Sequence, residues 1–127
     1  MSAKASIDQF EIECAVWHPN AHASTISQIV GLTPRIQWSS GDINGSTGAL
    51  RDCTYCRFTV GRYSQIIINN GLKMLEPFKT LYQNDVFYNP GATIIVYFKN
   101  LDNASELHIN LLGLSTINEI KASIVFR

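Results

Sequence analysis

The segment Val30-Gly31-Leu32-Thr33-Pro34 ends a predicted helix and turns the chain toward a short strand. Gly31 follows the last apolar residue at helical spacing, where a left-handed backbone conformation favours glycine. Pro34 keeps the helix from resuming because proline has no backbone N–H group to donate. Asn20 is the predicted N-cap residue at the other end of this helix. The sequence therefore predicts a helix that starts after Asn20 and a strand over residues 35–38.

Alternation of apolar and polar residues predicts strands on both sides of this segment. Residues 7–17 place Cys14 and its apolar neighbours two positions apart on one face, which predicts a half-buried strand with Cys14 in the core. Residues 53–60 alternate in the same way and follow a glycine-rich loop over residues 39–48. We therefore expect residues 53–60 to pair as a hairpin with the strand at 35–38.

The second half of the chain predicts one long helix and three strands. Ser64 is the predicted N-cap residue of a helix that runs to residue 82. Gly71 weakens this helix, and Pro77 kinks or divides it. Residues 93–98 are apolar on both faces, which is typical of a central strand. Shorter alternating segments predict strands at 106–109 and 120–126.

The remaining connections complete the predicted order of elements. Asn89-Pro90-Gly91 predicts a turn, and a short helix can begin at Asn110 or near Thr116, since both stand at capping positions. The order is βαββαβ, with an extra strand and a short helix before the last strand. This order predicts an α+β fold: a mostly antiparallel sheet with two to three helices packed on one face, in a split βαβ, ferredoxin-like architecture.

Length and composition indicate a single domain over residues 1–127. The chain is 46% apolar and 16% charged, and its 10 basic residues balance 10 acidic ones. This balance disfavours nucleic acid and anionic membranes as main partners. Residues 1–6 contain no apolar signal segment, and no stretch is long enough to span a bilayer. The odd number of cysteines, three, suits a reducing compartment, so we expect a cytoplasmic protein.

The segment from Val30 to Pro34, with Trp38 and the pair Gly41-Asp42, resembles a motif of a family of small bacterial domains of unknown function, family 4279. The amphipathic stretch around Pro77 and the aliphatic final strand are also similar, so the resemblance spans most of the chain. Ser39-Ser40 departs from the family pattern, which is often basic there, and the segment before the last strand looks shortened. The resemblance implies the α+β fold and brings no assigned catalytic residue.

Cysteine and histidine pairs do not predict a metal, a cofactor or a catalytic site. Cys53 and Cys56 form a CxxC pattern, but residues three apart on a strand point to opposite faces, so we interpret them as structural. His18 and His22 have the spacing of zinc ligands on a helix. Pro19 separates them at the predicted helix start, so the two need not share a face.

Two further motifs receive structural interpretations. The segment from Arg57 to Tyr63 interleaves basic and aromatic residues, as RNA-binding sheets do. Phe58, however, falls on the apolar face of its strand, and the balanced charge disfavours nucleic acid. The glycine-rich residues 41–48 lack the Lys-Ser/Thr ending of a phosphate-binding loop, so we interpret them as a hairpin loop.

Four residues around this loop are the candidate binding residues: Trp38, Asp42, Arg51 and Asp52. Trp38 is either a core residue, which we favour, or an exposed anchor for a partner. The leading hypothesis is a non-enzymatic protein-binding domain, in its most concrete form a bacterial immunity protein that binds and neutralises a cognate toxin. The alternative is a small-ligand-binding or enzymatic domain that uses a cleft beside the 39–52 loop.

Overall fold

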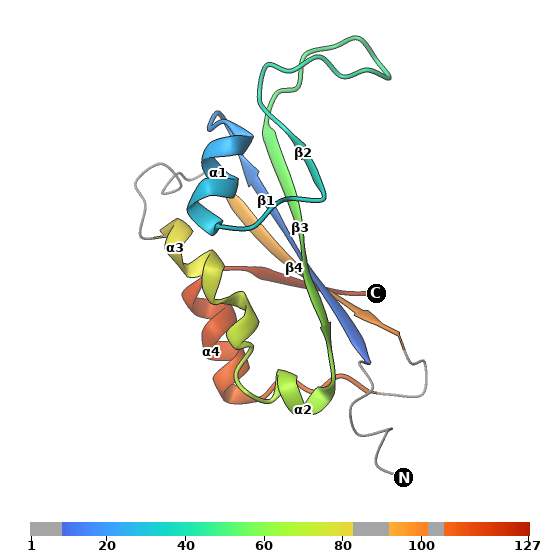
Figure 1. Cartoon of the computed structure of the whole chain (residues 1–127), viewed down its shortest axis with the longest axis vertical. Coiled ribbons are helices and arrows are strands. Elements are labelled where there is room, and N and C mark those ends of the chain that lie inside the picture. The colour runs from blue at the N-terminus through green and yellow to red at the C-terminus, as the bar shows by residue number, and fades with distance from the viewer. Residues whose placement is uncertain (1–8, 83–91, 102–105) are drawn as a thin grey trace.

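Five strands form one sheet in the order β2-β3-β1-β4-β5 (Figure 1). The computed structural model describes residues 9–82, 92–101 and 106–127. The strands are β1 (Phe10–His18), β2 (Ile36–Trp38), β3 (Thr54–Tyr63), β4 (Thr93–Asn100) and β5 (Ser123–Phe126).

The strand order confirms the predicted split βαβ architecture. β3 lies between β1 and β2 and is antiparallel to both, so it splits the first βαβ unit. β1 in turn lies between β3 and β4 and is antiparallel to both, so it splits the second unit. β5 extends this four-stranded arrangement as a fifth strand, parallel to β4. The α+β class and the mostly antiparallel sheet are therefore as predicted.

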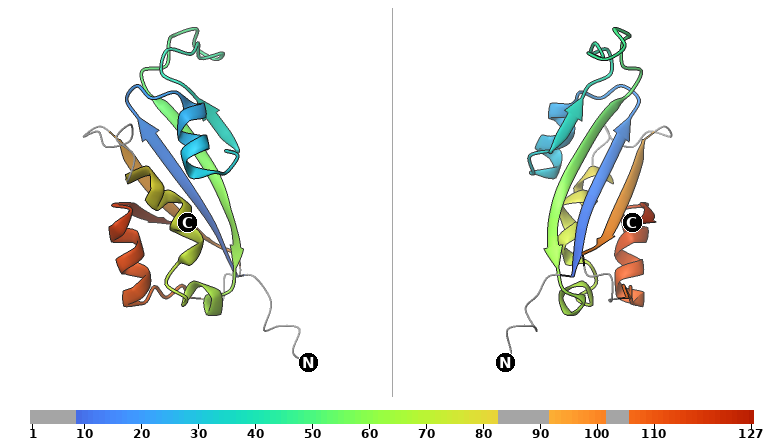
Figure 2. Two further views of the ribbon diagram at one scale, coloured as in Figure 1. Left: turned by 60° about the vertical axis from the view of Figure 1, so that its left-hand side comes forward. Right: turned by 90° about the vertical axis from the view of Figure 1, so that its right-hand side faces the viewer.

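All described helices cover the same face of the sheet. They are α1 (Ala23–Val30), α2 (Gln65–Ile68), the 3-10 helix η2 (Lys73–Phe78), α3 (Lys79–Tyr82) and α4 (Leu111–Glu119). In the right-hand view of Figure 2 the strands lie in front of these helices. The main core fills the space between, with Cys14 and Phe58 from the sheet and Ile26, Leu75 and Ile117 from the helices. Burial of these side chains supplies most of the driving force for folding.

The helix ends follow the predicted chemistry with one correction. Gly31 ends α1 in the left-handed conformation, at φ 79°, as predicted. His22, not Asn20, is the N-cap residue of α1, because the Nδ1 atom of His18 accepts hydrogen bonds from the backbone of Asn20 and Ala21 and holds them in a turn. Ser64 caps α2 as predicted. Asn110 caps α4, which decides between the two predicted starts.

The long helix predicted up to residue 82 is wrong, because the chain breaks into α2, η2 and α3. The break lies at Gly71 and Leu72, which both have positive φ. Pro77 fits inside η2 without interrupting it.

Two predicted strands also need correction. Residues 106–109 form no strand, because β5 occupies the edge of β4. The strand predicted at 120–126 starts only at Ser123, because Ile120 ends α4 and Lys121 is left-handed. The turn predicted at residues 89–91 lies outside the described residues. The longest described helix has 9 residues, and none of the described helices could cross a membrane.

Candidate functional site

The side of the sheet away from the helices, here called the open face, carries the candidate site. Every second side chain of the inner strands points to it, since side chains alternate along a strand. The outward residues are Glu11, Glu13, Ala15 and Trp17 on β1, Tyr55, Arg57 and Thr59 on β3, and Ile95, Tyr97 and Lys99 on β4.

A bulge in β3 extends this face toward the far end of the strand. Ile12 pairs with Gly61 while Glu13 pairs with Thr59, so Val60 is an extra residue on β3. The extra residue shifts the alternation by one position. Arg62 therefore stands opposite Glu11 and pairs with it, at 3.3 Å between Nε and Oε2.

One half of the open face is an aromatic cluster, formed by Ala15, Trp17, Trp38, Tyr55, Ile95, Tyr97 and Val125. The ring centroids of Trp17 and Trp38 each lie 4.7 Å from that of Tyr55. Tyr55 and Tyr97 are only 7% and 9% exposed, although they lie on the face away from the helices. The half-buried Trp17 and Trp38 are thus the accessible edge of a small second core.

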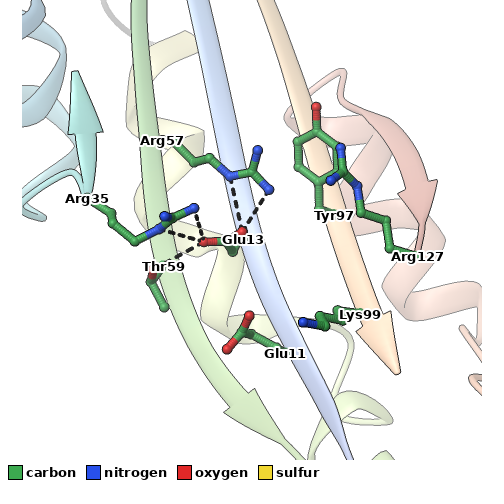
Figure 3. Close-up of a pocket in the computed structure, with 8 residues that line it drawn as sticks. All are labelled: Glu11, Glu13, Arg35, Arg57, Thr59, Tyr97, Lys99 and Arg127. Carbon is green, nitrogen blue, oxygen red and sulfur yellow. Dashed lines mark hydrogen bonds and ion pairs between the residues drawn. The ribbon is translucent and has the colours of Figure 1, made fainter. Parts of the chain in front are cut away.

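The other half is a charged groove of about 430 Å³ (Figure 3). It is lined by Glu11, Glu13, Arg35, Arg57, Thr59, Tyr97, Lys99 and Arg127. Tyr97 belongs to both halves: the guanidinium carbons of Arg57 and Arg127 lie 4.5 and 4.6 Å from its ring centroid. Such stacking of a cation on an aromatic ring fixes the plane of the guanidinium group.

Glu13 organises the cations of the groove. Its Oε1 accepts hydrogen bonds from Nε and Nη2 of Arg57, at 3.1 and 2.7 Å. Its Oε2 accepts from Nε of Arg35 at 3.0 Å and from the Thr59 hydroxyl at 3.3 Å. Burial alone would raise the pKa of Glu13, but the hydrogen bonds and positive charges of Arg57 and Arg35 outweigh it and lower the pKa below its ordinary value.

The structure brings three of the four predicted binding residues together. The guanidinium carbon of Arg51 lies 3.9 Å from the ring centroid of Trp38. The backbone N–H of Arg51 donates to the carbonyl of Asp42, whose carboxylate accepts from the Ser39 N–H at 2.8 Å. Asp52 is exposed and makes no side-chain hydrogen bond or ion pair with the described residues.

Trp38 lies outside the main core but packs against the small second core, so it matches neither a fully buried core residue nor a freely exposed anchor. It is half-buried in the aromatic cluster, between Tyr55 and Arg51. The loop after it forms a hairpin arm over residues 41–51 that projects beyond the sheet (Figure 1). Ile43 and Leu50 pair across this arm and are 71% and 67% exposed.

A smaller pocket of about 270 Å³ lies at the foot of the arm, lined by His22, Ala23, Ser24, Gln37, Trp38, Ser39 and Asp42. The Nδ1 atom of His22 is 2.7 Å from the Ser24 hydroxyl, a distance typical of a nucleophile and its base. The same Nδ1 atom also accepts the Ser24 backbone N–H, because His22 caps α1. We therefore assign this contact to helix capping.

Cys14 and Cys56 are structural, as interpreted from the sequence, whereas Cys53 lies just before β3 and is only partly buried. Cys14 and Cys56 are fully buried in the main core, and all three thiols are free. Burial raises the pKa of the Cys56 thiol to about 11 and that of Cys14 still further. The thiols of Cys14 and Cys56 are therefore protonated and unreactive near neutral pH. In the described part of the chain, no three His, Cys, Asp or Glu side chains are placed to hold a metal ion.

Sequence reasoning missed most of the open face. Alternation placed Glu11 and Glu13 opposite the apolar face of their strand, yet it gave no sign that Arg57, 44 positions further along, would bind Glu13. The interleaved basic and aromatic residues near Arg57 were a usable signal, since Tyr55 and Arg57 do share the open face.

Comparisons with protein-family models, with curated proteins and with solved structures found no match to this chain.

Proposed function

We propose that this chain is a non-enzymatic protein-binding domain that docks its partner on the open face of its sheet. The observation that carries the proposal is the aromatic cluster, whose half-exposed Trp17 and Trp38 lie beside the charged groove. Tryptophan, tyrosine and arginine are the residues that most often dominate the binding energy of protein interfaces. The described helices cover the other face and leave this one free.

The anchoring side chains are already held in place. Trp38 packs between Tyr55 and Arg51, and Tyr97 lies between two guanidinium groups. A partner therefore pays little conformational entropy to order them, which favours affinity.

A bacterial immunity protein that occupies and neutralises a cognate toxin is the most concrete form of this proposal. The sequence resemblance to small bacterial domains supports this form of the proposal. The balanced net charge counts against a strongly basic nuclease toxin as the partner, because inhibitors of such toxins tend to be acidic.

The test is complex formation with the toxin domain encoded beside this gene, measured by calorimetry and by survival of cells that produce the toxin. Trp38→Ala should weaken the complex by about 2 kcal/mol or more, as expected for a hot-spot residue. The control is Leu111→Ala on α4, which removes a side chain that is 85% exposed on the helix side. If Leu111→Ala weakens the complex more than Trp38→Ala, the interface lies on the helices and not on the open face. If the chain neither binds the toxin domain nor protects the cells, the immunity role is wrong.

The pocket at the foot of the arm favours a second candidate function, the binding of a small ligand. Trp38 and Asp42 line it, as the sequence-based alternative requires, whereas Arg51 and Asp52 do not. A thermal-shift screen with metabolites and metal ions tests this candidate, since a ligand at 100 times its dissociation constant stabilises the fold by about 2.7 kcal/mol. A screen without any shift would count against it.

A further inference from the structure

The charged groove has an excess of positive charge. Four basic side chains line it against two acidic ones, which leaves two positive charges in excess. Glu11, one of the two acids, is also engaged by Arg62, which does not line the groove. The local charge thus differs from that of the whole chain, which is balanced.

Two of the four cations have no acidic partner in the part of the chain that the structure describes. Glu13 takes both Arg35 and Arg57, at 3.0 and 2.7 Å, so one carboxylate serves two guanidinium groups. Lys99 and Arg127 are exposed and form no ion pair with an acidic side chain among the described residues. Figure 3 shows both beside the groove, Lys99 from β4 and Arg127 over Tyr97.

These cations are oriented by their neighbours. Tyr97 stacks against Arg57 and Arg127 and so directs the faces of both guanidinium groups. The edge of Arg57 is bound to Glu13, whereas the guanidinium N–H groups of Arg127 make no hydrogen bond with the described residues and can donate to an acceptor on a partner. Planar N–H edges match the two oxygens of a carboxylate. Within the fold itself, Glu13 shows that these edges bind a carboxylate, although each guanidinium group uses a single oxygen: Arg57 binds Oε1 and Arg35 binds Oε2.

We infer that the charged groove binds the carboxylate of an aspartate or glutamate side chain on the partner, beside an apolar or aromatic side chain that packs on the aromatic cluster. The inference rests on the proposed function, because it names the chemistry of the segment that docks on the open face. The two parts of the segment are adjacent because Tyr97 belongs to both the groove and the cluster.

A phosphate group or a nucleic acid fits the groove less well. Glu11 and Glu13 line the groove and repel a dianion more strongly than a single carboxylate. The balanced charge of the chain gives no long-range attraction for a polyanion. Tyr55 and Tyr97 are buried under their neighbours and offer no free ring face on which bases could stack.

Tryptophan fluorescence of the full chain can test the inference directly. The chain has only two tryptophans, Trp17 and Trp38, and both belong to the aromatic cluster, so their emission reports on the open face. Trp38 also lines the pocket at the foot of the arm, so the Lys99→Gln variant is needed to assign a change to the groove. The probe is a short peptide without tryptophan that alternates glutamate and phenylalanine. The comparison peptide carries glutamine in place of each glutamate, and a single-stranded oligothymidylate of equal charge serves as the nucleic-acid arm.

The glutamate peptide should change the emission saturably, with an affinity that falls as salt rises. Glutamine in place of glutamate should weaken binding about tenfold or more, since charge-assisted hydrogen bonds are lost. Lys99→Gln should lower the affinity for the glutamate peptide by a similar factor. The matched control is Lys73→Gln in η2, which removes one exposed positive charge on the helix side and should leave the affinity unchanged.

Each contrary result has its own meaning. Equal affinity for the two peptides would overturn the carboxylate inference and leave the docking face in place. Tighter binding of the oligonucleotide, or competition by inorganic phosphate but not by acetate, would overturn it in favour of phosphate groups. If neither peptide changes the emission up to about 1 mM, the inference fails, and the proposed function is then decided by the toxin-domain complex alone.

Discussion

Glu13 ties together three segments that are distant in the sequence. Its carboxylate lies on β1 and receives Arg57 and Thr59 from β3, together with Arg35 from just before β2. The side chains of Glu13 and Arg57 are only 13% and 15% exposed, so solvent screens this pair less than a surface pair. The shape of the charged groove therefore depends on one carboxylate.

Glu13→Gln should destabilise the fold by roughly 1–3 kcal/mol, because Arg57 loses a charged acceptor in a half-buried place. Glu11→Gln is the matched control: it is the same change on the same strand and face, and its partner Arg62 is 62% exposed. An exposed pair contributes about 0–1 kcal/mol, so the control should be nearly neutral. Urea unfolding, followed by tryptophan emission, measures both values. Equal losses would show that Glu13 has no special role.

The contribution of Glu13 should also depend on pH. Its pKa is lower in the folded chain than the ordinary value of about 4.3 in the unfolded chain. In acid, the unfolded state therefore binds more protons than the folded state. The stabilisation that Glu13 contributes is complete above the ordinary pKa of glutamate, and it is lost as the pH falls through the pKa that Glu13 has in the folded chain. The difference in unfolding free energy between the natural chain and Glu13→Gln should thus shrink between pH 6 and about pH 3. A difference that stays constant over this range would contradict the assignment.

At the scale of elements, the broken helix after β3 shows where local sequence signals mislead. Apolar residues at helical spacing continue through Ile68, Leu72 and Leu75, and all three are buried in the main core. The sequence marks two weak points in this helix: Gly71, which lowers helix propensity, and Pro77, which disturbs a helix interior. The chain turns at Gly71 and Leu72, with φ 82° and 56°, and then continues as η2 through Pro77. Packing of Leu72 and of α4 decides this turn, and neither is visible in the local sequence.

Gly71→Ala should cost more stability than Gly31→Ala, although both glycines have nearly the same φ, 82° and 79°. A Cβ atom on Gly31 would meet nothing within 4 Å, so that substitution costs only backbone strain of roughly 1–2 kcal/mol. A Cβ atom on Gly71 would lie 2.6 Å from the Cγ atom of Leu112, which adds roughly 1–3 kcal/mol of overpacking. Denaturant unfolding of both variants measures the difference.

Comparing Gly71→Ala with Gly31→Ala in a chain that also carries Leu112→Ala separates the cost of backbone strain from the cost of overpacking. Without the Cγ and Cδ atoms of Leu112, the extra cost at Gly71 should disappear and the two alanine substitutions should become equal. If the extra cost persists in this background, the contact between Gly71 and Leu112 on α4 is not its cause.

At the scale of the whole molecule, the sequence predicted the strands and the class of fold, but it left the order of the strands in the sheet open. Alternation around Cys14 and Cys56 gave two strands and their apolar faces, and the loop between β2 and β3 gave the hairpin. The open face could not be predicted in the same way, because it depends on which side the helices cover. The groove depends in addition on contacts such as Arg57 with Glu13, which exist only after β1 and β3 have paired.

The two buried thiols test whether the sheet and its helices unfold as one unit. Cys14 on β1 and Cys56 on β3 lie in the main core, whereas Cys53 is half-exposed before β3. A disulfide reagent near pH 8 should label Cys53 rapidly and the other two only after unfolding, because thiols with raised pKa values at fully buried positions do not react. Cys53→Ser should remove only the fast phase.

If the chain unfolds as one cooperative domain, the labelling rates of Cys14 and Cys56 should rise equally with denaturant concentration. Their dependence on denaturant should then match that of global unfolding. The two strands are neighbours, and Cys56 stands opposite Val16 of β1, so a local opening that exposes one thiol should disturb the other. Faster labelling of Cys56 with no denaturant dependence would instead show that the β2–β3 edge opens alone. That edge carries Trp38, so its opening would also loosen the aromatic cluster on which the proposed docking face depends.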